Sequence, residues 1–304
     1  HVYSTLYRTY FDGEEFRRNR KLLTLIPLGL FFAGVLLYAI HPLWFWRTLA
    51  YVAVFHFIRQ QYGFLRLYAR EENPTPLERH SATAVIYAAT LYPLLYWHSR
   101  TDRDFHWFLA GDFWTAVPEG LAQAGFVVYL GVIALYLFTE TRASLRRGGF
   151  NLPKNGIVFG TLLSWYLGIV HFNLDLVFTI TNVVSHGIPY LALIWVYGAR
   201  RRERGELVGA SHFVSRVIGI PAFFGLLLLF AYVEEGFWAG FVWREHLAAF
   251  PIFAELPPLT SHEALSLLVP LLALPQATHY VLDGFIWRIK DPEATWTDVL
   301  WGRT

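Results

Sequence analysis

The 304-residue chain contains no cysteine. This absence excludes disulfide bonds, thiolate-ligated zinc, cysteine-ligated iron–sulfur clusters and thiol catalysis. Methionine is absent too, and because the sequence begins at His1 we expect its N-terminus to be incomplete. Charged residues make up only 16% of the chain, and its net charge is +2. Without a strongly basic field, nucleic acid is not an expected partner.

Several catalytic motifs are missing as well. No two histidines lie within four residues of each other, whereas membrane fatty-acid desaturases and hydroxylases carry HxxxH, HxxHH or HH clusters. The motifs HExxH and GxSxG are absent, as are the GxxxxGK[ST] and GxGxxG loops of nucleotide-binding proteins. No internal repeat or low-complexity linker divides the sequence, so we predict one domain over residues 1–304.

Apolar residues are abundant, since 55% of the chain is hydrophobic and 18% is aromatic. Apolar runs of about 20 residues, the length that a helix needs to cross a bilayer, recur along the sequence. This pattern predicts an all-α, polytopic integral membrane helical bundle with about eight transmembrane helices. The expected spans are residues 22–40, 43–68, 81–97 and 121–138, two within 156–197 with a turn between 173 and 182, and then 217–232 and 264–287.

If successive spans cross the membrane in alternate directions, the lysine and arginine residues are distributed unevenly between its two sides. Arg100, Arg103 and Arg244 flank spans on one side, and nearly all other flanking basic residues fall on the opposite side. Because cytoplasmic loops carry the excess of Lys and Arg, the richer side is predicted to be cytoplasmic. Both termini are then cytoplasmic, and the expected location is a bacterial inner membrane. Residues 241–250 are predicted to form an interfacial helix between the last two spans.

Four histidines fall inside predicted spans, at His56, His171, His186 and His279. Ionisable groups inside a bilayer are costly and by default mark a functional site. Imidazole is the commonest protein ligand of iron, copper and zinc, and its second nitrogen usually donates to a carboxylate or an amide. Three of the four histidines are followed, four residues later, by a carboxylate or an amide that lies on the same helical face. The pairs are His56/Gln60, His171/Asp175 and His279/Asp283. We therefore predict a metal site formed by the four histidines, with the three polar residues as supporting groups or further ligands.

A simpler interpretation is that each of these histidines only hydrogen-bonds to a neighbouring helix. Arg59 and Tyr62, near mid-depth of the second predicted span, are candidate catalytic residues that could anchor the polar end of a substrate. They could equally neutralise an aspartate or satisfy one another. The remaining histidines fall at span ends or in loops, where we expect them to be solvated: His1, His41, His80, His98, His106, His212, His246 and His262.

Single histidines dispersed over several membrane helices, with aspartates nearby, resemble the pattern of the Brp/Blh family of membrane β-carotene dioxygenases. The similar segments are HFNLD, around His171 and Asp175, and QATHYVLDGFIW, around His279 and Asp283. In that family a non-haem iron held by histidines cleaves the central double bond of a carotenoid to give retinal. The resemblance implies a non-haem iron cofactor and a carotenoid substrate for this chain.

The leading hypothesis is a membrane-embedded, iron-dependent oxidoreductase that acts on a hydrophobic substrate such as a carotenoid or a lipid. One alternative is a b-type cytochrome, in which pairs of histidines ligate haem b and the protein transfers electrons. Another is a transporter or an accessory subunit of a membrane complex, in which His and Asp relay protons or satisfy packing. Membrane lipid is an expected partner in every case.

Overall fold

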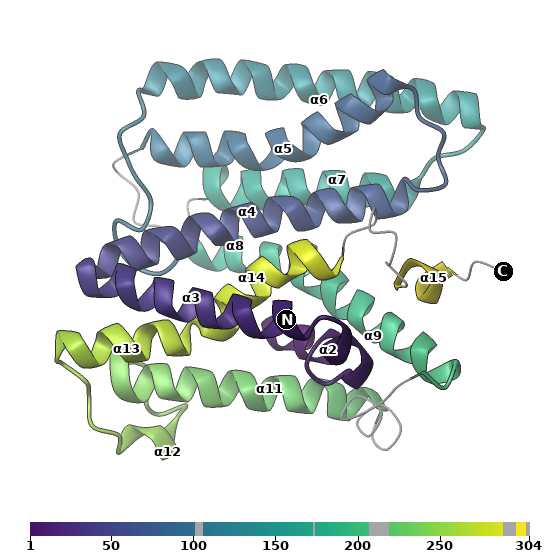
Figure 1. The fold of residues 1–304 in the computed structure, drawn as a ribbon. Helices are drawn as coiled ribbons and strands as arrows, with labels where there is room; N and C mark the ends of the chain where they lie inside the picture. Colours follow the sequence, from purple (N-terminus) through teal and green to yellow (C-terminus); the bar gives the residue numbers. More distant parts are fainter. Residues whose placement is uncertain (101–105, 173, 207–218, 288–295, 302–304) are drawn as a thin grey trace. The chain divides into compact units, whose positions relative to one another are not determined.

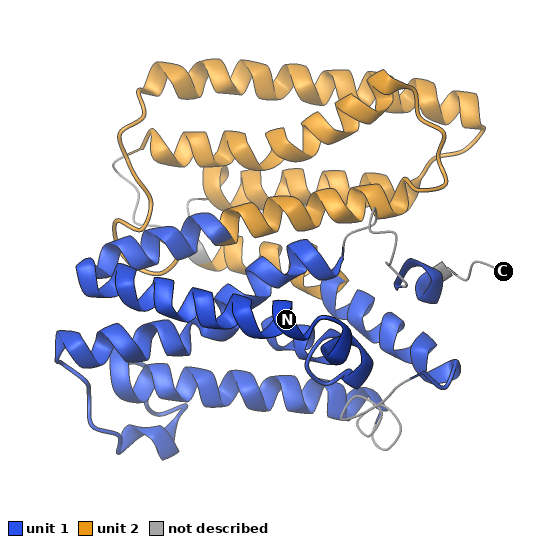
Figure 2. Ribbon diagram, in the orientation of Figure 1, with its two compact units in different colours: residues 1–52, 190–304 blue, residues 53–189 orange. Residues whose placement is uncertain are grey.

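The computed structural model describes residues 1–100, 106–172, 174–206, 219–287 and 296–301, and these residues form helices and loops without a strand (Figure 1). The chain forms two compact units, which Figure 2 distinguishes by colour. Unit 1 combines residues 1–52 with residues 190–304, and unit 2 is the continuous segment 53–189. The all-α class predicted from the sequence is therefore confirmed for the described residues.

Unit 2 begins inside α4 and ends at Pro189. Its helices start and stop at recognisable signals. Thr75 accepts a hydrogen bond from the Glu78 N–H at 3.3 Å, and the Glu78 carboxylate accepts one from the Thr75 N–H at 2.9 Å, which is a capping box at the start of α5. Gly148 ends α6 in the left-handed conformation with φ of 68°, which glycine adopts without strain. The elements are α4 (Pro42–Tyr68), α5 (Pro76–His98), α6 (Glu119–Arg147), α7 (Leu152–Trp165), the π-helix η2 (Tyr166–His171), α8 (Asp175–Asn182) and the π-helix η3 (Val183–Gly187).

The core of unit 2 lies where α5 packs against α6 and α7. Tyr92 of α5 stacks on Tyr129 of α6 with ring centroids 4.7 Å apart. Gly168 of η2 allows an unusually close approach to α8, because a Cβ atom there would lie 2.7 Å from the Cα of Phe178. Any larger residue at position 168 would therefore push these two helical segments apart.

Charged side chains form a buried network between α6, α7 and the loop that follows α4. The Lys154 ammonium lies 2.9 Å from a Glu72 oxygen and 2.5 Å from a Glu140 oxygen, and its side chain is only 3% exposed. Arg147 donates to Glu140 at 3.0 Å, and the Asn155 amide donates to the same carboxylate at 3.1 Å. Each buried charge thus has an opposite charge beside it, as the low dielectric of an interior requires.

In unit 1, α3 packs against α13 and α14. The helix pair α13 and α14 is bent by 43°, and Pro275 occupies the first turn of α14, where its missing N–H is tolerated. The elements of this unit are the 3₁₀-helix η1 (Val2–Ser4), α1 (Thr5–Arg8), α2 (Gly13–Arg18), α3 (Arg20–Ile40), α9 (Ile188–Glu203, which starts in unit 2), α11 (Gly219–Phe237), the π-helix η4 (Trp238–Trp243), α12 (Pro251–Ala254), α13 (His262–Leu272), α14 (Leu274–Ile286) and α15 (Trp296–Trp301).

Among the described residues, four helical segments are long and apolar enough to cross a membrane, and the bent pair α13–α14 raises the number to five if it forms one span. The four are Arg20–Ile40, Glu119–Arg147, Leu176–Glu203 and Gly219–Trp243. Their exposed faces are apolar; on α6, for example, Val127 is 70% exposed and Phe138 is 57% exposed. Faces of this kind suit lipid better than water, so the chain has the character of an integral membrane protein.

One local prediction was wrong. Residues 241–250 do not form an interfacial helix, because η4 ends at Trp243 and Arg244 and His246 both have positive φ, which no helix tolerates. The break predicted between residues 173 and 182 is confirmed, and it lies at the start of that range. Leu174 is extended, with φ of −126° and ψ of 124°, and α8 occupies Asp175–Asn182.

Candidate metal centre

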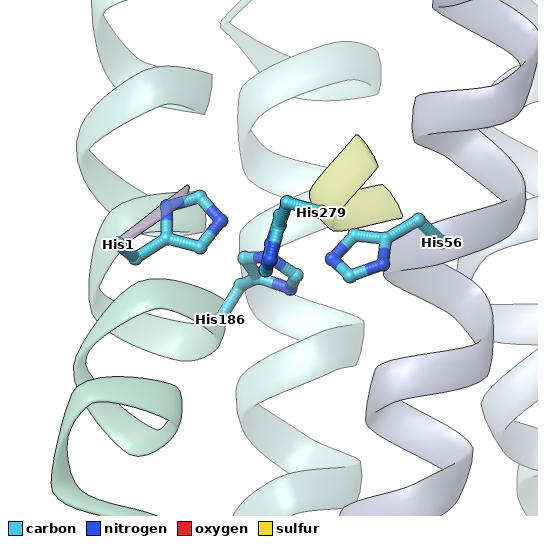
Figure 3. Close-up of side chains that lie close together, drawn as sticks. All are labelled: His1, His56, His186 and His279. Atoms are coloured by element: carbon cyan, nitrogen blue, oxygen red, sulfur yellow. The ribbon is translucent and has the colours of Figure 1, made fainter. Parts of the chain in front are cut away.

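In unit 2, His56 of α4 lies beside His186 of η3 (Figure 3). Their ring centroids are 5.1 Å apart with an interplanar angle of 80°. Both residues are buried, at 3% and 1% exposure. Two imidazoles in an apolar interior must find polar partners or a metal to offset the loss of their hydration.

The π-helical turn at His186 is held by two glutamines of α4. The Gln60 amide donates to the His186 carbonyl at 2.9 Å, and the Gln61 amide donates to the Ser185 carbonyl at 2.9 Å. A π-helical turn shifts the backbone hydrogen bonds from i→i−4 to i→i−5, and such turns recur at functional sites. Gln60 was predicted to support the His56 ring, but its amide instead fixes the backbone of the second histidine of the pair.

Aromatic side chains surround this pair. The Phe57 ring lies 4.4 Å from the His186 ring, and Trp107 lies 5.6 Å from Phe57 between their centroids. The loop that carries Trp107 is held by Asp112, whose carboxylate accepts the Phe108 N–H at 2.7 Å. Burial raises the pKa of Asp112, and the N–H groups that it accepts partly oppose that shift. The result is a largely apolar wall that excludes water from the histidines.

In unit 1, His1 lies beside His279 of α14, with ring centroids 4.9 Å apart and an interplanar angle of 79° (Figure 3). His279 is 1% exposed, whereas His1 is partly exposed. Asp283 is one turn from His279, as predicted, but the nearest distance between its carboxylate and the His279 Nδ1 is 3.6 Å. This is too long for a hydrogen bond. The atom that does reach Nδ1 is the Thr5 hydroxyl, at 2.7 Å.

Each unit thus contributes one pair of candidate ligands, and the four histidines of these two pairs are called the candidate group: His1, His56, His186 and His279. Within each pair, the candidate ligand nitrogens lie within 4.8 Å of each other. Three of the four predicted histidines belong to this group, and the fourth member is His1, which the sequence pattern assigned to the solvated histidines. Its place beside His279 depends on the packing of η1 against α14, and no periodicity within either segment reveals that contact.

Other predicted site residues lie elsewhere. His171 is exposed at the end of η2 and is not part of the group, and the extended Leu174 breaks the helical face that it was predicted to share with Asp175. The side chain of Asp175 lies outside the described part of the structure. Arg59 donates to the Tyr87 hydroxyl at 3.1 Å, and its guanidinium lies 5.2 Å from the centre of the Tyr62 ring. The two candidate catalytic residues thus contact each other.

The chain matches no protein-family model, no curated protein and no solved structure. The function proposed below therefore depends on the chemistry of the histidines and on the membrane character of the helices.

Proposed function

We propose that the chain is a membrane-embedded, metal-dependent oxidoreductase whose metal ligands come from the histidine pairs His56/His186 and His1/His279. The observation that supports this most is the pairing of histidines, with ring centroids 5.1 and 4.9 Å apart, in the interior of a protein with apolar, span-length helices. Imidazoles in such a setting are expensive to bury, and a cation bound by a pair satisfies both of its rings.

The geometry within each pair fits shared ligation. Two imidazoles that bind one metal at about 2.1 Å, with a tetrahedral angle between them, have ring centroids about 5 Å apart. Their ligating nitrogens are then about 3.5 Å apart. The observed centroid separations match, and nitrogens within 4.8 Å of each other reach ligation by small rotations of the rings.

The same distances argue against a haem held within either pair. A bis-histidine haem has the porphyrin plane and both iron–nitrogen bonds between its axial ligands, so the ring centroids are at least about 6 Å apart. The rings of His56 and His186 are closer than this and lie almost perpendicular to each other. The non-haem alternative is therefore the one we adopt over haem b.

We propose iron as the metal and a hydrophobic molecule such as a carotenoid or a membrane lipid as the substrate. Imidazole ligands suit iron among several transition metals, and bound iron would supply the redox chemistry of dioxygen. The apolar wall of Phe57 and Trp107 suits a hydrocarbon chain and keeps water from the site. The resemblance to Brp/Blh dioxygenases favours the carotenoid, although one of its two motifs contains His171, which lies outside the candidate group.

The test of this proposal is the metal content and the absorption spectrum of protein purified in mild detergent. We expect bound iron and no Soret band, because each histidine pair suits a non-haem metal. Cleavage of added β-carotene, followed by loss of its visible absorption, tests the substrate. Protein with neither metal nor haem would leave the transporter or accessory-subunit alternative, and a Soret band would favour the cytochrome.

We also propose that α4, α5 and α7 with η2 cross the membrane, giving eight spans with both termini in the cytoplasm of a bacterial inner membrane. α4 is 27 residues long and α5 is 23, so both can cross, although their sequences are more polar than those of the other spans. The distribution of Lys and Arg supports this orientation.

Single-cysteine labelling tests the orientation, since the chain has no cysteine of its own. The segments 70–79, 148–154 and 200–209 carry the Lys and Arg excess. Glu71→Cys, Gly149→Cys and Glu203→Cys should therefore react only with a reagent that reaches the cytoplasmic face. Thr115→Cys, on the opposite side in this topology, should react only from outside. Labelling of Gly149→Cys from outside would overturn the eight-span arrangement.

A further inference from the structure

Four side chains of unit 1 form a buried chain of hydrogen bonds that ends at His279. Asp283 accepts from the Tyr190 hydroxyl at 2.7 Å. The Tyr190 and Thr5 hydroxyls lie 2.9 Å apart, and the Thr5 hydroxyl lies 2.7 Å from the His279 Nδ1. Thr5 is 4% exposed and Tyr190 and His279 are each 1% exposed, so water does not compete for these bonds.

With Asp283 ionised, the number of protons available fixes the direction of each bond. A hydroxyl has one proton to donate, and Tyr190 donates its proton to Asp283. Thr5 must therefore donate to Tyr190. Its own proton is then used, so Thr5 can only accept at the next link, and His279 must donate from Nδ1.

Trp287 supports this direction. Its indole Nε1–H, which can only donate, lies 3.5 Å from the Tyr190 oxygen. The Tyr190 oxygen thus accepts hydrogen bonds from Trp287 and from Thr5. The one proton of its hydroxyl is donated to the Asp283 carboxylate. The 3.6 Å separation between the Asp283 oxygen and the His279 Nδ1 is compatible with the same arrangement, because a carboxylate attracts an N–H dipole.

We propose that Thr5, Tyr190 and Asp283 are positioning residues that hold neutral His279 in the tautomer with its proton on Nδ1. The lone pair is then on Nε2, which is the atom that His279 presents as a ligand. The tautomer follows from the hydrogen bonds alone, and its use in binding metal rests on the proposed function. The sequence pattern predicted that Asp283 supports His279 by direct contact. In the structure, Asp283 acts on His279 through the hydroxyl groups of Tyr190 and Thr5.

The experiment is ¹⁵N NMR of histidine-labelled, metal-free protein at a pH of about 8, where an unperturbed imidazole is neutral. The His279 signals are identified by their loss in His279→Gln. We expect a protonated Nδ1 and an unprotonated Nε2. In Tyr190→Phe, Thr5 loses its acceptor and is able to donate to His279, so we expect a substantial population with the proton on Nε2 instead.

Thr5→Val and Thr5→Ser form a matched pair that separates positioning from packing. Valine keeps the shape but removes both hydrogen bonds, and it should mix the two tautomers; serine keeps the hydroxyl and should restore the Nδ1–H form. A proton on Nε2 in the unmodified protein, or no change in Tyr190→Phe and Thr5→Val, would overturn the proposal.

Iron binding by the same variants separates this inference from the proposed function. We expect Tyr190→Phe to weaken iron binding by about 10- to 100-fold, as is typical when the group behind a histidine ligand is removed. If His279 has the Nδ1 proton but no preparation binds a metal, the proposed function fails and the positioning role in setting the tautomer stands. If iron binds while the proton is on Nε2, the positioning role fails and the metal site stands.

Discussion

His186→Ala and His279→Ala should each reduce the affinity for iron by more than about 100-fold, because each removes a nitrogen that is a direct metal ligand in the proposed function. One variant lies in each unit, so the pair also tests whether both units contribute to the same site. Iron per chain after dialysis against a weak chelator, together with a competition titration, measures the loss. Thermal unfolding of the metal-free variants shows whether each remains folded.

His171→Ala is the most informative control. The sequence pattern assigned it a ligand role, but it is exposed at the end of η2 and outside the candidate group. We expect it to keep the iron content of the unmodified protein, as should His80→Ala, whose side chain is also exposed. A loss of iron in His171→Ala as large as that in His279→Ala would favour the ligand set predicted from the sequence.

Lys154→Met should destabilise unit 2 by about 3 to 5 kcal/mol, the usual cost of removing one partner from a buried ion pair. The Lys154 ammonium lies within 2.9 Å of both Glu72 and Glu140, and without it two buried carboxylates depend on Arg147, which is 22% exposed. Thermal or denaturant unfolding in detergent, followed by circular dichroism, measures the change. Tyr136 and Asn155 also belong to this network, because the Tyr136 hydroxyl donates to the Asn155 side-chain oxygen at 2.7 Å.

Two further variants identify the cause of that loss. Adding Glu140→Gln to Lys154→Met removes one uncompensated charge at nearly constant volume, so it should recover part of the stability. Arg142→Ala removes an exposed charge from the same helix, α6, and should change stability by less than about 0.5 kcal/mol. An equally unstable double variant would show that packing of the Lys154 side chain, rather than its charge, supports unit 2.

The helices could be predicted because their signals are local. A run of about 20 apolar residues and a proline or glycine just after it specify α3 or α6 without knowledge of the rest of the chain. The π-helical segments could not be predicted, since one additional residue in a turn leaves no compositional trace. His171 and Asp175 do not share a helical face because Leu174 between them is extended, and residues 244–250 form a loop where the interfacial helix was predicted.

In the candidate site, too, local signals could be predicted from the sequence and long-range contacts could not. His56, His186 and His279 could be predicted because a buried imidazole is unusual enough to be noticed in isolation. Thr5 and Tyr190 could not, because they are ordinary residues whose role depends on partners 274 and 185 positions away in the sequence. Hydrogen bonds over such separations are set by tertiary packing, and no periodic pattern in a single sequence reveals them.

The division of unit 1 into two segments has a consequence for biosynthesis. Residues 1–52 leave the ribosome first, but the part of unit 1 that completes them begins only at Tyr190, after all of unit 2 has been made. His56 and His186 are therefore able to pair before His279 has been translated. His1 cannot pair with His279 until nearly the whole chain has been translated. Until α13 and α14 have been made, α3 lacks the helices that it packs against, and a ribosome that stalls between residues 189 and 279 would release a protein with the His56–His186 pair alone.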